Sequence, residues 1–130
     1  MPSQIPIKTS SAPEPVGPYN QAIKAGEFLY CSGQIAINPE TNEINNLGDI
    51  KGETRQVLKN LEAVLIAGGA SLEDVIKTTI FLTDLKNFNE VNNTYKEFFK
   101  SEPSPARACV EVSSLPKGVL IEIDCVAYIH

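Results

Sequence analysis

The sequence predicts an α+β fold in a single domain, residues 1–130, with two helices on one face of a mixed sheet. A chain of 130 residues can form one hydrophobic core but not two. Apolar residues alternate near both ends of the chain, as in strands, and follow a helical spacing in two internal segments. Because each helical segment stands between strand-like segments, we expect each helix to lie in a crossover between strands.

The N-terminal third predicts an extended arm followed by a hairpin. Residues 1–18 contain closely spaced prolines, so they should form an arm with a short edge strand near 5–8. A hairpin is expected over 21–35, because Ala25-Gly26 can form its turn. Residues 37–44 have the composition of a further turn.

Apolar spacing predicts the two helices. The first is expected between residues 49 and 67, and Gly68-Gly69 should end it. Its apolar positions are Val57, Leu58, Leu61, Val64 and Leu65. Its polar positions, largely on the opposite side, are Glu53, Arg55, Lys59 and Glu62. The second helix is expected over 88–99, after a strand at 75–82 that is rich in β-branched and aromatic residues.

Two final strands are predicted at 106–112 and 119–129, joined by a turn that contains Pro116. In the last strand, one set of alternating residues mixes apolar and acidic side chains: Leu120, Glu122, Asp124, Val126 and Tyr128. The other set is apolar, so neither face of this strand is a plain polar surface. Two helices can cover only one face of the sheet. We therefore expect the other face to pack against another subunit, with sites in the grooves between subunits.

Composition excludes several classes of protein. The formal net charge of −5 and the pI near 4.8 argue against a nucleic-acid partner and against an anionic membrane surface. No stretch is apolar enough for a membrane helix and the N-terminus lacks a targeting pattern, so a cytoplasmic protein is expected. Three cysteines without a CxxC pair fit neither a disulfide framework nor a zinc knuckle. The one histidine, His130, is the last residue, which excludes a multi-histidine metal site and disfavours a catalytic triad.

Two charged residues inside predicted strands are the main candidates for chemistry. Arg107 keeps its charge at any working pH, so it could clamp a substrate carboxylate or phosphate, or form a salt bridge with Glu111 or Glu122. Glu122 stands between two isoleucines, where a charge is costly unless it is paired or used. It could hold and deprotonate a water molecule, or pair with Arg107 or a lysine.

Four further residues are candidates for lining a pocket. Tyr19 offers a hydroxyl at the end of the arm, although it could instead fill an apolar gap. Gly33, after Ser32, permits close approach of a ligand to the backbone. Asn92 lies on the second helix and could equally be a solvent-facing or packing residue. Cys109 has no histidine to activate it, so we expect a small strand residue rather than a nucleophile.

The order and spacing of several blocks resemble one known family. The most specific blocks are Gly17-Pro18-Tyr19-Asn20-Gln21-Ala22, Pro105-Ala106-Arg107-Ala108-Cys109-Val110-Glu111-Val112 and Ile121-Glu122-Ile123-Asp124. Over nearly its whole length the chain resembles the RidA/YjgF family of reactive-intermediate deaminases, also known as L-PSP endoribonuclease proteins. The resemblance implies a chorismate-mutase-like fold and a homotrimer with a barrel-like core and an active site in each cleft between subunits.

The resemblance also implies an activity, the hydrolysis of 2-imino acids such as 2-iminobutanoate and 2-iminopropanoate to 2-keto acids and ammonia, without metal or cofactor. Arg107 would hold the substrate carboxylate, Glu122 would position the attacking water, and Tyr19 would line the pocket across a subunit boundary. The other implied pocket positions are Ser32, Gly33, Asn92 and Cys109, the last through its backbone amide. Two alternatives remain open, an endoribonuclease or translation inhibitor and a regulatory protein that binds a small carboxylate.

Overall fold

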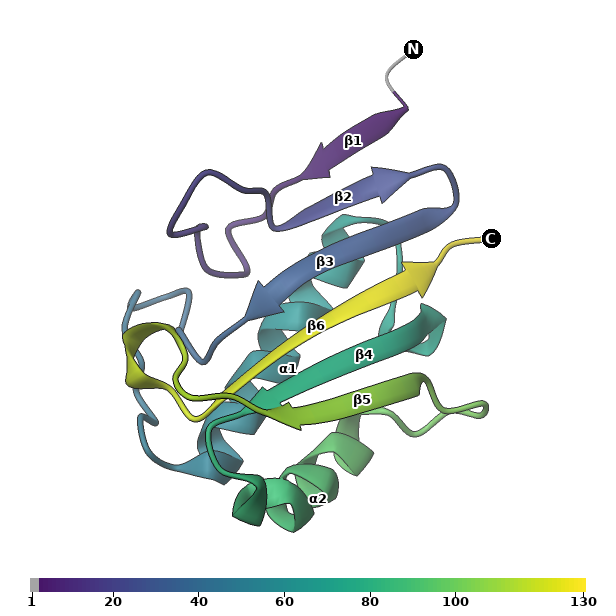
Figure 1. Ribbon diagram of the computed structural model, residues 1–130. Helices are drawn as coiled ribbons and strands as arrows, with labels where there is room; N and C mark the ends of the chain where they lie inside the picture. The colour runs from purple at the N-terminus through teal and green to yellow at the C-terminus, as the bar shows by residue number, and fades with distance from the viewer. Residues whose placement is uncertain (1–2) are drawn as a thin grey trace.

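The computed structural model describes residues 3–130 and confirms the α+β class, with six strands in one mixed sheet and two helices (Figure 1). The elements in chain order are β1 (Gln4–Ile7), β2 (Ala22–Ala25), β3 (Phe28–Gln34), α1 (Ile50–Ala67), β4 (Val75–Leu82), α2 (Phe88–Phe98), β5 (Ala106–Glu111) and β6 (Ile121–Tyr128). Each predicted helix and strand is present, with ends within about two residues of those expected. None of the helices that the structure describes combines the length and the apolar character needed to cross a membrane.

The order of strands across the sheet is β1-β2-β3-β6-β4-β5, so the last strand of the chain lies near the middle. β6 pairs antiparallel with both β3 and β4, while β4 and β5 are parallel. α1 connects β3 to β4 across β6, and α2 connects β4 to β5, so both helices lie in crossovers as predicted. The end of β3 and the start of β6 both lie next to the N-terminal arm.

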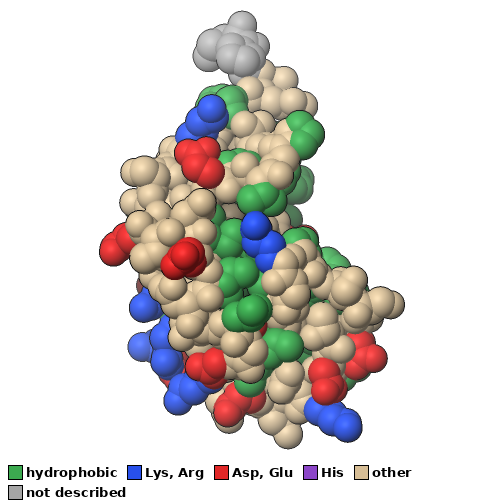
Figure 2. Space-filling view, turned by 90° about the vertical axis from the view of Figure 1, so that its left-hand side faces the viewer, with side chains coloured by type: hydrophobic (Ala, Val, Ile, Leu, Met, Phe, Trp, Pro, Cys, Tyr) green, Lys and Arg blue, Asp and Glu red, His purple; other side chains and the backbone are tan. Residues whose placement is uncertain are grey.

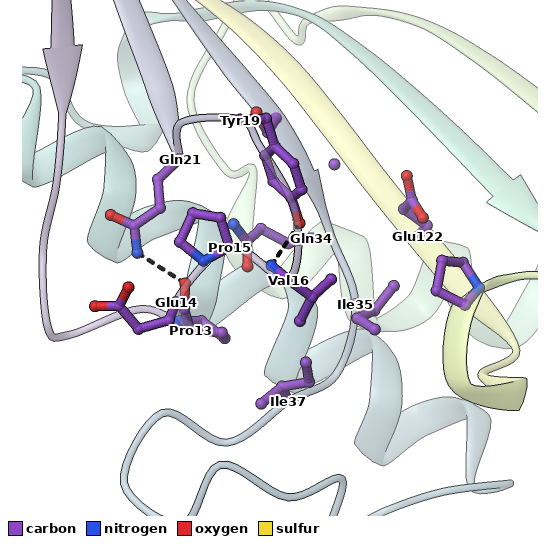
Figure 3. Close-up of a pocket in the computed structure, with 13 residues that line it drawn as sticks. Pro13, Glu14, Pro15, Val16, Tyr19, Gln21, Gln34, Ile35, Ile37 and Glu122 are labelled. Carbon is purple, nitrogen blue, oxygen red and sulfur yellow. Dashed lines mark hydrogen bonds between the residues drawn. The ribbon is translucent and has the colours of Figure 1, made fainter.

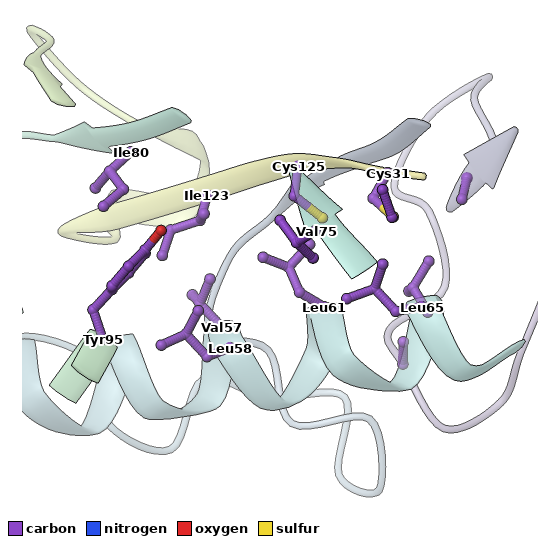
Figure 4. Packing of buried hydrophobic residues seen from close by; sticks show 14 of the residues in the cluster. Cys31, Val57, Leu58, Leu61, Leu65, Val75, Ile80, Tyr95, Ile123 and Cys125 are labelled. Carbon is purple, nitrogen blue, oxygen red and sulfur yellow. The ribbon is translucent and has the colours of Figure 1, made fainter. Parts of the chain in front are cut away.

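The core lies between the sheet and α1 (Figure 4). The five apolar positions predicted for the first helix are all completely buried, which confirms its inward face. They pack against the alternate residues of β6 that point toward the helices, Ile121, Ile123, Cys125 and Ala127. This packing determines which residues of β6 face away from the helices, and Glu122 is one of them.

Glu53 departs from the expectation for the first helix, because it is completely buried. Its carboxylate accepts hydrogen bonds from the backbone N–H groups of Gly48 and Leu120, both at 2.9 Å. The carboxylate thus connects the start of α1 to the residue that precedes β6. Glu53 therefore helps to fix the start of the strand that carries Glu122.

No helix or strand within residues 3–130 covers the face of the sheet opposite the helices, which is the near face in Figure 1. Apolar side chains on this face remain exposed, among them Phe28, Tyr30 and Val110. The same face carries Glu122 and Asp124 of β6, both partly buried. The uncovered face therefore carries the set of alternating residues of the last strand in which the sequence analysis noted a mixture of apolar and acidic side chains.

Candidate active site

The sheet register separates Arg107 from Glu122. Arg107 of β5 is paired with Thr78 of β4, which in turn is paired with Cys125, so Arg107 lies on the face that the helices cover. Glu122 is paired with Phe81 and points to the opposite face. The two charges therefore do not form a salt bridge within one chain, and that alternative is wrong. The one salt bridge in residues 3–130 joins Arg55 to Glu97.

Four of the predicted residues lie together around one cavity of about 440 Å³ (Figure 3). Tyr19 and Glu122 are on opposite sides of it. Ser32 and Gly33, near the end of β3, also line it. The rest of the lining consists of six apolar residues, Pro13, Pro15, Val16, Ile35, Ile37 and Pro116, and three polar ones, Glu14, Gln21 and Gln34. On the side of the molecule at the left of Figure 1, hydrophobic side chains gather along the middle (Figure 2). A cavity that combines two carboxylates, those of Glu14 and Glu122, with a largely apolar wall suits a small organic ligand.

Glu122 is a half-buried carboxylate, and none of the cations in residues 3–130 forms a salt bridge with it. Burial raises the pKa of Glu122 above its ordinary value, and the nearby charge of Asp124 raises it further. A carboxylate with a raised pKa accepts a proton from water more readily than an ordinary glutamate. Glu122 can therefore act as a general base at the edge of the cavity.

Gly33 leaves the space that the Glu122 carboxylate occupies. The β3–β6 register is irregular between Cys31 and Gln34, so the backbone of β3 departs from regular pairing at this point. A Cβ atom at Gly33 would overlap the carboxylate oxygen of Glu122 and lie 2.9 Å from its carboxyl carbon. The sequence analysis predicted that Gly33 lets another group come close to the backbone. In the structure that group is the Glu122 side chain of the same chain.

Tyr19 and Ser32 have part of their hydrogen-bonding capacity already engaged. The Tyr19 hydroxyl accepts a hydrogen bond from the Val16 backbone N–H at 3.3 Å, which leaves its proton free for another acceptor. The Ser32 hydroxyl donates to the carbonyl oxygen of Asn20 at 2.6 Å. Ser32 therefore holds the base of the arm, whereas Tyr19 can donate into the cavity.

Arg107 and Asn92 form a second group in a shallow hollow beside α2. The guanidinium donates a hydrogen bond to the Asn92 side-chain oxygen at 2.8 Å. It also lies 5.5 Å from the ring centre of Phe88 and 5.0 Å from that of Tyr95, within range of cation–π attraction. These contacts hold the guanidinium in place while most of its donors stay available for an anion.

Cys109 follows Arg107 on the same face of β5 but lines neither hollow within one chain. Burial raises the pKa of the Cys109 thiol, and the positive charge of Arg107 only partly opposes this effect. The sulfur is therefore held as a thiol rather than a thiolate, which agrees with the expectation that Cys109 is not a nucleophile.

Comparison with known proteins identifies the family of this chain. The family model described as "Endoribonuclease L-PSP" matches residues 9–129. The chain belongs to the L-PSP/RidA family. It is 57% identical over 122 residues to a RutC family protein of Pyrococcus horikoshii, covering 94% of this chain and 95% of the relative. It is 44% identical over 124 residues to a protein of Dermatophagoides farinae named 2-iminobutanoate/2-iminopropanoate deaminase, covering 95% of each.

Solved structures of this family have the same fold. A Rid family protein from Yersinia pestis has a TM-score of 0.92 at 48% identity, covering 97% of this chain and 99% of that one. TdcF from E. coli, solved with bound serine, has a TM-score of 0.90 at 40% identity, with the same coverage. The family resemblance seen in the sequence is thus confirmed, together with the fold it implied.

In this L-PSP/RidA chain, four polar residues near the cavity were not among the predicted site residues: Glu14, Gln21, Gln34 and Asp124. Gln21 belongs to one of the sequence blocks on which the family resemblance rests, so the sequence could have identified it as a site residue. Asp124 shares the face of Glu122 two residues along β6, so strand alternation could have found it. The two isoleucines of the apolar wall follow β3, where the sequence predicted a strand end and a turn.

We expect Gly33→Ala to remove most of the catalytic turnover at the cavity that contains Glu122, with a small effect on the stability of the fold. The added methyl group would push the Glu122 carboxylate away from the cavity, because the two cannot occupy the same space. Gly26→Ala is the matched control, since a Cβ there contacts nothing but the residue has φ +62°. That substitution should cost about 1 kcal/mol of unfolding free energy and leave turnover unchanged. Turnover assays and thermal melts of both variants measure the contrast, and full activity of Gly33→Ala would contradict the role given to Glu122.

Proposed function

We propose that this protein hydrolyses 2-imino acids, such as 2-iminobutanoate and 2-iminopropanoate, to 2-keto acids and ammonia. The observation that carries the proposal is the half-buried Glu122 carboxylate, which lines a largely apolar cavity and forms no salt bridge with any cation that the structure describes. The reaction also needs a group that binds the substrate carboxylate. Arg107 can do this, because its guanidinium is held in place and has hydrogen-bond donors available.

The two groups can act on one substrate only if two copies of the chain meet. Arg107 and Glu122 point to opposite faces of one sheet, so Arg107 of a second copy would have to close the cavity that contains Glu122 of the first. The uncovered, partly apolar face of the sheet supports such a contact. The family resemblance implies three copies, and we propose such a homotrimer, with three sites between subunits. Light scattering during gel filtration should give about three times the chain mass of 14.1 kDa.

The proposed reaction needs little more than positioning. Arg107 holds the substrate carboxylate, while Glu122 accepts a proton as the oxygen of a water molecule bonds to C2 of the iminium group. Glu122 then gives that proton to the nitrogen of the tetrahedral intermediate and accepts the proton of its hydroxyl group, so the C2–N bond breaks, ammonia leaves and a keto group forms. Tyr19 donates a hydrogen bond to the oxygen as charge develops on it. The reaction needs no group beyond these side chains and water.

The relatives support this substrate class. The Dermatophagoides farinae relative is named as a deaminase of the same two imino acids. The structure of E. coli TdcF contains serine, an amino acid that carries the carboxylate and C2–N groups of the proposed substrates.

The family description also names an endoribonuclease, and this is the second candidate function. The charged side chains that line the described cavity are both acidic, Glu14 and Glu122. A polyanion would be repelled there, since affinity for nucleic acids depends on lysine and arginine contacts to phosphates. The cavity therefore favours the imino acid hydrolase over the nuclease.

A coupled assay tests the proposal. A serine or threonine dehydratase generates the imino acid in solution, and release of the 2-keto acid is followed with and without this protein. We expect the protein to accelerate release in proportion to its concentration. The same preparation should leave a single-stranded RNA intact. Unchanged keto acid release would contradict the proposal, and RNA cleavage would favour the second function.

A further inference from the structure

The N-terminal arm depends on one buried side chain for its attachment to the sheet. We propose that Gln21 is a positioning residue for the reaction proposed above, because it holds the arm that carries Tyr19 over the cavity. From here on, the arm means residues 9–19 of the segment between β1 and β2. The inference rests on the proposed function.

Gln21 is almost completely buried, with 3% of its surface exposed, and it uses both ends of its amide. Its side-chain oxygen accepts from the Thr9 backbone N–H at 2.7 Å. Its side-chain nitrogen contacts the carbonyl oxygen of Pro13 at 2.8 Å (Figure 3), and also those of Thr9 at 3.0 Å and Ala12 at 3.3 Å. One side chain thus binds the arm at three residues.

Little else of polar character attaches the arm. Its prolines have no N–H to donate, so the backbone cannot join the sheet as a strand would. The other hydrogen bonds described for residues 9–18 stay within the arm and Tyr19: Ser11 to Thr9, Val16 to Tyr19, and Tyr19 to Gly17. Apart from the apolar burial of Ala12 and Pro13, Gln21 is therefore the main link between the arm and the sheet.

The position of Gln21 joins this link to the site. It stands two residues after Tyr19, at the point where the arm enters β2, and it lines the same cavity. Its backbone carbonyl also accepts from the Ser32 N–H at 2.9 Å, which ties it to β3 beside Gly33. Loss of the side-chain amide would free the arm without touching Glu122. The Tyr19 hydroxyl and the Val16 part of the wall would then lose their fixed places.

The first test is a double-mutant cycle that combines Gln21→Met with Tyr19→Phe. Gln21→Met keeps the length of the side chain but removes its donor and acceptor, and we expect kcat/KM to fall about tenfold to a hundredfold. In the Tyr19→Phe background the same change should cost much less, because the hydroxyl that Gln21 positions is already gone. Gln56→Met is the matched control and should leave kcat/KM unchanged, since Gln56 lies on α1 and the one side-chain hydrogen bond described for it joins Asn60.

The second test does not depend on activity. Hydrogen–deuterium exchange should be faster over residues 9–19 in Gln21→Met than in the wild type, with no change over α1. Equal losses of kcat/KM in both backgrounds, or unchanged exchange of the arm, would overturn the inference. A wild-type protein without imino acid hydrolysis would instead contradict the proposed function, and the exchange would still decide whether Gln21 anchors the arm.

Discussion

Arg107→Ala should lower kcat/KM for 2-imino acids by about a hundredfold or more. The substitution removes the guanidinium that we propose binds the substrate carboxylate, and losing one partner of a desolvated charge pair costs about 2–5 kcal/mol. The folding cost should be much smaller, because within one chain Arg107 makes one hydrogen bond and two cation–π contacts at an exposed edge. We therefore expect the variant to fold and to assemble as the wild type does.

The control for this experiment is Arg55→Ala. Arg55 is the other arginine of the chain, and its exposed ion pair with Glu97 should contribute less than about 1 kcal/mol to stability. Steady-state assays with gel filtration of both variants measure the contrast. Retained activity in a folded, assembled Arg107→Ala would show that Arg107 does not bind the substrate.

The elements of the fold could be predicted because local patterns specify them. The apolar spacing of α1 and the alternation in β6 each identify the element and its buried face without knowledge of its neighbours. The order of strands is different, since pairing β6 between β3 and β4 joins segments far apart in the chain. Which strands pair, and in which register, depends on long-range packing that one sequence does not display.

The candidate site shows the same division. Residue types in unusual places identified Arg107 and Glu122, because a charge inside a strand is costly unless it has a partner or a use. Their mutual orientation could not be predicted, since a shift of one residue in register would have put them on the same face. Gln21 and Glu53 were not expected to be buried, because their partners are backbone groups that only the folded chain brings close.

Glu122→Gln should reduce kcat for 2-imino acids by about a hundredfold or more, with a smaller effect on substrate binding. The amide keeps the shape of the side chain but cannot accept a proton from the attacking water, and general base catalysis commonly contributes 10²–10⁴-fold, as an order of magnitude. Glu73→Gln is the matched control, because Glu73 is exposed in the short turn before β4, and its activity should be unchanged. A Glu122→Gln variant with normal kcat would contradict the role of general base.

The pH profile provides an independent test of the same role. Burial and the charge of Asp124 both raise the pKa of Glu122 above its ordinary value of 4.5, and the base must be ionised to act. Activity of the wild type should therefore fall with decreasing pH at a point above 4.5. Asp124→Asn removes the second cause, so it should lower the pKa of Glu122 and move the acid limb of kcat/KM toward lower pH. An acid limb that stays in place in Asp124→Asn would mean that another group controls the loss of activity.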